Sequence, residues 1–132
     1  MEAYNWEEYL DFANSLLKGD SAVNCSDETK IRIAISRAYY AAYHVADDYL
    51  RHNGEMVCGQ GAHDSVIQGF KSLAKKKKHA SKEYNQISND LNSLKMSRQR
   101  ADYEAEWHES GKFAQVRCKI AQKVIERVKS LK

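Results

Sequence analysis

Four side chains that could do chemistry lie on one face of a long predicted helix. Arg37, Tyr40, His44 and Asp48 are separated by three, four and four residues. Seven residues of an α-helix turn through about 700°, within roughly 20° of two full turns, so Arg37 and His44 project in the same direction. A guanidinium binds anionic oxygens, and an imidazole exchanges protons near neutral pH. The face is therefore a candidate site, with Tyr40 and Asp48 beside the Arg37 and His44 pair.

Two other interpretations of this face stay open. His44, Asp48 and His52 follow one another at intervals of four residues, a spacing that could hold a metal ion. The sequence offers no further ligand at a fixed spacing, so we favour a solvated face with a helical salt link. Arg37 and His44 could instead form an internal polar network, with Asp48 or Asp102 as a partner, that fixes helix register. We predict neither a metal nor a cofactor.

The composition favours one all-α domain. The chain has 132 residues, no proline and six glycines, and it is rich in good helix formers. This length predicts a single domain over residues 1–132. The 21 Lys and Arg residues exceed the 18 Asp and Glu residues by three, so net charge alone does not indicate a nucleic-acid-binding protein.

The cysteines and the N-terminal segment point to the cytoplasm. Cys25, Cys58 and Cys118 are widely separated and lack C-x-x-C spacing. Neither a disulfide framework nor a thiolate zinc site is expected, which fits a reducing compartment. The N-terminus is acidic and aromatic, and no run approaches the ~20 apolar residues that cross a bilayer. We expect a soluble, unprocessed, cytoplasmic protein without a membrane segment.

Hydrophobic periodicity predicts the elements that position the candidate face. Apolar residues recur every three or four positions in the segments 2–18, 27–52, 63–75, 81–94 and 112–132. Ser26 and Ser81 are expected N-caps, and the apolar spacing stops after Leu94, which predicts a frayed helix end and a loop over 95–111. Short connections favour an antiparallel up-and-down bundle of four to five helices, with 27–52 as its spine.

Two glycine- or lysine-rich segments lie between the predicted helices. Lys75–Lys78, with His79 and Lys82 nearby, could steer the phosphates of RNA in a salt-dependent way. A lysine run between helices is more often a solvated loop, and we favour that interpretation. Gly59-Gln60-Gly61 precedes a predicted helix start, where an anion could bind, but a plain turn is the better interpretation.

A second candidate group lies in the predicted loop after the fourth helix. Arg98 and Arg100 could hold a phosphate while Tyr103 stacks on a base. Alternatively, Arg100 or Asp102 could anchor this loop on the bundle. The sequence leaves both interpretations open.

Three short blocks, in this order, carry a resemblance to a known family. They are SRAYYAAYH over 36–44, HDSVIQGF over 63–70 and LKMSRQRADYE over 94–104. Together they resemble the HEPN domain family (higher eukaryotes and prokaryotes nucleotide-binding), and specifically its small stand-alone members with an RAYYA-type central helix. The likeness extends from about Ile31 to the end of the chain.

The resemblance implies a helical bundle, frequent homodimerisation and, in active members, a metal-independent endoribonuclease with an R-x4-6-H motif. Arg37 and His44 fit that motif with a gap of six residues. An imidazole can take the proton of a ribose 2′-hydroxyl while a guanidinium neutralises the phosphate. The resemblance thus implies catalytic roles for Arg37 and His44, an RNA substrate, and a toxin–antitoxin or antiphage setting. Tyr40, Asp48, Arg98, Arg100 and Tyr103 are the expected substrate-binding residues.

A second role is also compatible with the resemblance. Other members of the family act as non-catalytic modules beside a protein such as a nucleotidyltransferase. In that case the polar face of the central helix would bind a protein partner.

Overall fold

The chain forms a bundle of helices. A computed structural model describes residues 3–19, 22–53 and 62–131, and this part contains helices and no strand. The helices are α1 (Glu7–Leu16), α2 (Asp27–His52), α3 (Ala62–Lys76), the short 3-10 helix η1 (Lys78–Ala80), α4 (Ser81–Tyr103) and α5 (Gly111–Ser130). The predicted all-α bundle is confirmed. Residues 54–61, where we expected a loop with the Gly59-Gln60-Gly61 turn, lie outside the described part.

Helix α2 begins and ends where its sequence predicts. The hydroxyl of Ser26 accepts a hydrogen bond from the backbone N–H of Thr29 (3.2 Å), so Ser26 is the N-cap. Acidic residues occupy the first turn of α2 and basic residues the last, as the helix dipole favours. A series of buried alanines, Ala34, Ala38, Ala41, Ala42 and Ala46, lets neighbouring helices approach closely. Helix α2 contacts each of the other four α-helices and is the spine of the bundle.

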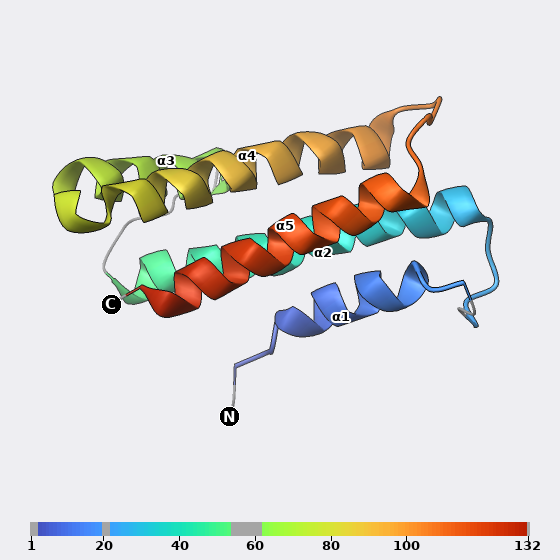
Figure 1. The fold of residues 1–132 in the computed structure, drawn as a ribbon, viewed down its shortest axis with the longest axis horizontal. Coiled ribbons are helices and arrows are strands. Elements are labelled where there is room, and N and C mark those ends of the chain that lie inside the picture. The colour runs from blue at the N-terminus through green and yellow to red at the C-terminus, as the bar shows by residue number, and fades with distance from the viewer. Residues whose placement is uncertain (1–2, 20–21, 54–61, 132) are drawn as a thin grey trace.

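The other helices surround α2 on several sides. Helices α3 and α4 form an antiparallel hairpin on one side of the α2–α5 pair, and α1 lies on the opposite side of that pair (Figure 1). Gly69 allows α3 to approach α2, because a Cβ there would lie 2.8 Å from Cδ1 of Leu50. The hydroxyls of Tyr49 and Tyr84 hydrogen-bond (2.9 Å) beside the buried ring of Phe70. These contacts fix the position of α3 and α4 against α2.

Helix α4 is longer than the sequence predicts. We expected it to fray after Leu94, but it continues to Tyr103. Its last turns bury Ser97, Arg98 and Ala101. The inward-facing positions thus continue at helical spacing, but two of the three are polar. The end of α4 is held by Arg32, whose guanidinium donates to the carbonyl oxygens of Ala101 (3.3 Å) and Glu104 (2.6 Å).

Two further expectations need correction. Helix α1 covers Glu7–Leu16, which is shorter than the expected 2–18, and Trp6 occupies its N-cap position. Ser81 is the first residue of α4 and not its cap, because Ala80 stands at the N-cap position. Helix α5 is capped by Ser110, whose hydroxyl accepts from the N–H of Phe113 (3.2 Å). Within the described residues, no helix has the length and apolar character that a membrane span requires.

Candidate functional site

The phenol ring of Tyr40 lies within reach of two guanidiniums. The Cζ atom of Arg37, one turn earlier on α2, is 5.0 Å from the centroid of this ring, and the Cζ of Arg98 from α4 is 5.6 Å from it. Arg37 also lies over Tyr9 of α1 (5.1 Å), and Arg98 over Tyr39 (5.6 Å). Cation–π attraction therefore holds two positive charges at one aromatic ring. An anion that enters here would be attracted by both.

His44 lies on the same face, under a tryptophan. Its imidazole stacks on the indole of Trp6, with ring centroids 3.6 Å apart and planes 16° apart. The rings of Tyr43 (5.1 Å) and Tyr40 (6.2 Å) are also close. Burial lowers the pKa of His44 below its usual 6.5, and nearby Arg37 acts in the same direction. The carboxylates of the next turn partly oppose this shift, and the lowered pKa favours the neutral form of the imidazole.

A second histidine, which the sequence analysis did not single out, completes the cluster. His63, in the first turn of α3, stacks on Tyr43 with centroids 4.5 Å apart, and its Nδ1 hydrogen-bonds the hydroxyl of Tyr39 (2.5 Å). Burial is the main cause that lowers the pKa of His63, and the positive charge of Arg98 adds to it. His63 stands in the second HEPN-like block, which is the one sequence signal that marks it.

Much of the hydrogen-bonding capacity of this face is unused by the described part of the chain. Arg37 makes one side-chain hydrogen bond there, from Nη2 to the hydroxyl of Ser36 (3.1 Å), and the ring nitrogens of His44 make none. The Nε of Arg98 also has no partner there, although its Nη1 pairs with Asp102 (3.4 Å). Arg37 and His44 are half-buried, so they are neither sealed in the core nor fully satisfied within it.

Acidic residues border the face without forming a metal centre. Asp47 is buried and pairs with Arg51 (2.9 Å), whereas Asp48 is half-buried and its backbone carbonyl oxygen hydrogen-bonds Nδ1 of His52 (2.7 Å). His52 is therefore engaged with its own helix. In the described residues, no three His, Cys, Asp or Glu side chains are grouped so that they could bind a metal ion. Asp47 and Asp48 act on His44 electrostatically, since both raise its pKa.

A pocket of about 400 Å³ opens beside Arg37, between α2 and α4. Its walls carry charged and hydroxyl groups together with apolar surface; the lining residues are Thr29, Arg32, Ile33, Ser36, Arg37, Ala101 and Asp102. Helix α1 and its N-cap flank one side of this face, where Arg37 contacts Tyr9 and His44 contacts Trp6. The α3–α4 hairpin flanks the other side, where Tyr40 contacts His63 and Arg98. This arrangement can bind a phosphate and accept a proton at neutral pH.

The comparison with protein families decides the identity of the fold. The model of the HEPN domain matches residues 6–131, nearly the whole chain. The chain belongs to the HEPN domain family. The family includes RNase domains that often occur in toxin–antitoxin and defence systems. Searches of curated proteins and of solved structures gave no match.

The predicted substrate-binding residues of this HEPN domain fall into two places. Tyr40, Asp48 and Arg98 lie with Arg37 and His44, although Arg98 reaches them from a helix and not from the expected loop. Arg100 and Tyr103 lie on the outer face of α4. Residues two positions apart on a helix point in directions about 200° apart, so Arg100 faces away from the side that carries Arg98. Arg100 pairs there with Glu104 (3.4 Å), and Tyr103 is 78 % exposed.

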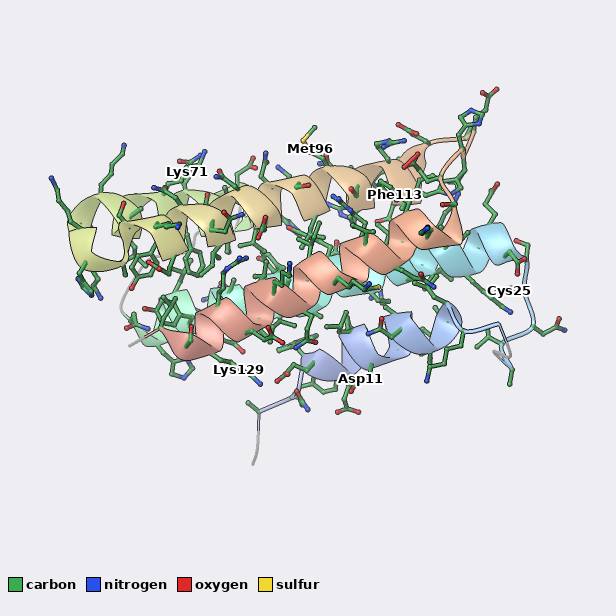
Figure 2. The ribbon with its side chains drawn as sticks, in the orientation of Figure 1. Asp11, Cys25, Lys71, Met96, Phe113 and Lys129 are labelled. Carbon is green, nitrogen blue, oxygen red and sulfur yellow. The ribbon has the colours of Figure 1, made fainter. Side chains whose placement is uncertain are left out.

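Arg100 and Tyr103 share a shallow surface feature. They line a depression of about 340 Å³ with Met96, Gln99 and Glu104. Figure 2 shows Met96 pointing away from the bundle on this side of α4. This depression and the Arg37–His44 face are on different sides of α4.

Proposed function

We propose that this HEPN domain is a metal-independent endoribonuclease of a toxin–antitoxin or antiphage defence system. The observation that carries the proposal is the polar face of α2. Two guanidiniums approach one tyrosine ring there. On the same face lies an imidazole whose pKa is lowered by burial and whose nitrogens have no hydrogen-bond partner among the described residues. A phosphodiester needs such cationic donors, and its 2′-hydroxyl needs such a base.

In the proposed reaction, His44 accepts the proton of a ribose 2′-hydroxyl. The 2′-oxygen then forms a bond to the adjacent phosphorus, and the bond from phosphorus to the 5′-oxygen breaks. The proton returns from the imidazolium or from water to this leaving oxygen, which leaves a 2′,3′-cyclic phosphate. Arg37 neutralises the charge that builds on the phosphate, with Arg98 behind it, and Asp48 stabilises the imidazolium of His44.

We further propose that the working unit is a homodimer. Each chain would present one Arg37–His44 face, and two such faces would form a common cleft for the RNA. Tyr40 orients the guanidiniums within each face. Arg100 and Tyr103, on the outer side of α4, would bind a more distant part of the RNA strand.

Cleavage of RNA in the presence of EDTA tests the proposal. The variants Arg37→Ala and His44→Ala are expected to lose about 100-fold or more in rate, as removal of a general base or of a charge-stabilising group does. His108→Ala is the matched control, because His108 is exposed and lies outside this face. Retention of cleavage and of growth inhibition by both site variants would show the proposal to be wrong.

A non-catalytic role is the second candidate, and one observation favours it. Trp6 covers a face of the His44 ring at 3.6 Å, as in a structural aromatic cluster. In that role the face of α2 would bind a protein such as a nucleotidyltransferase. Stable binding of that protein, lost in Arg37→Ala, together with no cleavage by the parent protein, would favour this candidate over the nuclease.

A further inference from the structure

Positive charge is concentrated at the turn between α3 and α4. Residues 71–82 contain six lysines and no acidic residue. The rest of the chain then has 15 Lys and Arg residues (21 − 6) against 18 Asp and Glu residues, a formal charge of −3. The molecule is therefore electrically polar, although its net charge of +3 is small. Such a local field attracts polyanions to one region of the surface.

The lysines line a concave pocket and not a flat loop. A pocket of about 660 Å³ lies between α3 and α4, and its lining includes Lys71, Lys75 and Lys78 with Ser72, Ser81 and Asn85. Among the residues that the structure describes, no carboxylate lines it. Figure 2 shows Lys71 projecting from the outer side of the α3–α4 hairpin.

The three lysines of this pocket are not used by the fold. Within the described residues, none of Lys71, Lys75 and Lys78 makes an ion pair, whereas Lys95 pairs with Asp64 and Lys129 with Glu7. Holding three ammonium groups together without counter-charges is unfavourable, and a bound anion removes this repulsion. The hydroxyls and the amide in the lining add neutral hydrogen-bond donors for anionic oxygens.

The spacing suits a chain of phosphates. Lys71 and Lys75 are four residues apart on α3, which places their attachment points about 6 Å apart along the axis. This distance is comparable to the step between successive phosphates of a nucleic-acid strand. His63 of the Arg37–His44 face begins the same helix, and Lys71 follows about 12 Å further along it. A strand bound at that face could thus continue toward the lysines.

We propose that this lysine pocket binds the sugar–phosphate backbone of single-stranded RNA, contacting about three phosphates. The inference rests on the proposed action on RNA, and it adds a second binding site outside the Arg37–His44 face. RNA fits better than a membrane surface, because the described apolar side chains that are large and exposed enough to insert into lipid, such as Tyr4, Phe12 and Met96, lie outside the pocket.

Equilibrium binding of a 2′-O-methyl oligonucleotide, followed by fluorescence anisotropy at several salt concentrations, tests this site. Neutralising three phosphates contributes about 0.7 × 3, or roughly 2, to the slope of log affinity against log salt. Combined replacement of Lys71, Lys75 and Lys78 by Ala should reduce the slope by about 2. Raising the salt from 50 to 200 mM weakens the binding of both proteins, and the factor by which affinity falls should be about twenty times smaller for this triple variant than for the parent.

The matched control replaces three exposed lysines of α5, Lys112, Lys119 and Lys123, by Ala. It removes the same charge and should leave most of the salt dependence intact. Replacing the pocket lysines by Arg should restore the slope, since the charge is kept. An equal effect of both Ala triples, or an unchanged slope in the pocket triple, would overturn the proposal. Binding of the parent to vesicles rich in anionic lipid, with no binding to the oligonucleotide, would also overturn it.

This experiment separates the pocket from the proposed nuclease. A 2′-O-methyl strand lacks the attacking hydroxyl, so its binding does not depend on cleavage. Binding that needs the pocket lysines, combined with no cleavage of unmodified RNA, would support the pocket and refute the nuclease. Suppose instead that cleavage requires His44, and that replacing the pocket lysines changes neither the salt slope of binding nor the cleavage rate. This result would support the nuclease and refute the pocket.

Discussion

The stack of Trp6 on His44 allows a quantitative test of how this HEPN domain sets the chemistry of its histidine. Trp6→Ala removes the indole from contact with the half-buried His44 and Tyr9 and with the exposed Tyr4. A well-packed aromatic pair contributes about 0.5–1.5 kcal/mol beyond buried area. Loss of the two half-buried pairs should therefore lower the free energy of unfolding by about 1–3 kcal/mol, and the exposed pair with Tyr4 adds little. A chain of 132 residues has an unfolding entropy of about 280 cal/mol/K, and the melting temperature should therefore fall by about 4–11 °C.

The same change should alter the protonation of His44. Burial is the main cause of its lowered pKa, and Trp6 covers one face of the ring. Removing the indole admits water, so the pKa of His44 should rise toward 6.5. NMR titration of the imidazole proton measures this rise directly, and a variant that lacks His44 assigns the resonance.

Tyr4→Ala is the matched control for Trp6→Ala. Tyr4 is 51 % exposed and touches Trp6 and Tyr9 but not His44. Because Tyr4 is half exposed, its two aromatic pairs contribute less than those of the half-buried rings. Tyr4→Ala should lower the free energy of unfolding by about 1 kcal/mol or less and leave the pKa of His44 in place. An unchanged pKa in Trp6→Ala, or an equal rise in both variants, would refute the reasoning that the indole desolvates the imidazole.

Three further changes have expected outcomes. His44→Phe keeps a ring under Trp6 but removes an imidazole whose pKa is lower in the folded chain than in the unfolded one. The parent should lose stability as the pH falls through 6.5, because the unfolded chain binds the proton more readily. Urea unfolding should show a smaller loss in His44→Phe. Phe70→Ala empties a fully buried site and should cost about 3–5 kcal/mol in calorimetry, against less than about 0.5 kcal/mol for the exposed Val116→Ala. Asp102→Ala removes the carboxylate partner of buried Arg98 and should lower the free energy of unfolding, measured with urea, by about 1–2 kcal/mol. This is less than the loss expected for a fully buried pair, because Asp102 is partly exposed. An unchanged free energy would mean that the pair is not stabilising.

Local signals explain which helices the sequence predicts well. The limits of α2 follow from a capping serine and from charges at both ends, and these act within one turn. The end of α4 could not be predicted by the same route, because its inward positions are Ser97 and Arg98. A buried guanidinium is tolerated there because Tyr39 and Tyr40 supply aromatic faces and Asp102 a charge, all of which depend on tertiary packing.

The same distinction applies to the candidate site. Arg37, Tyr40 and His44 share one face because they lie on one helix, and their spacing alone gives this result. Trp6 lies at the N-cap of α1 and His63 on α3, and no spacing in the sequence relates them to His44. Helix packing brings them there, and with them the burial that lowers the pKa of both histidines.

The position of α1 has a consequence for how the site can open. Helix α1 contacts only α2 and α5 among the described helices, whereas α2 contacts four. Detachment of this ten-residue helix would carry Tyr9 and the adjoining Trp6 away and uncover Arg37 and His44 while α2 stays folded. In native-state hydrogen exchange we therefore expect the amides of α1 to open by a sub-global route, at a lower free energy than those of α2. Access to the imidazole would then depend on the local stability of one short helix, and a ligand that needs His44 uncovered would measurably increase exchange in α1.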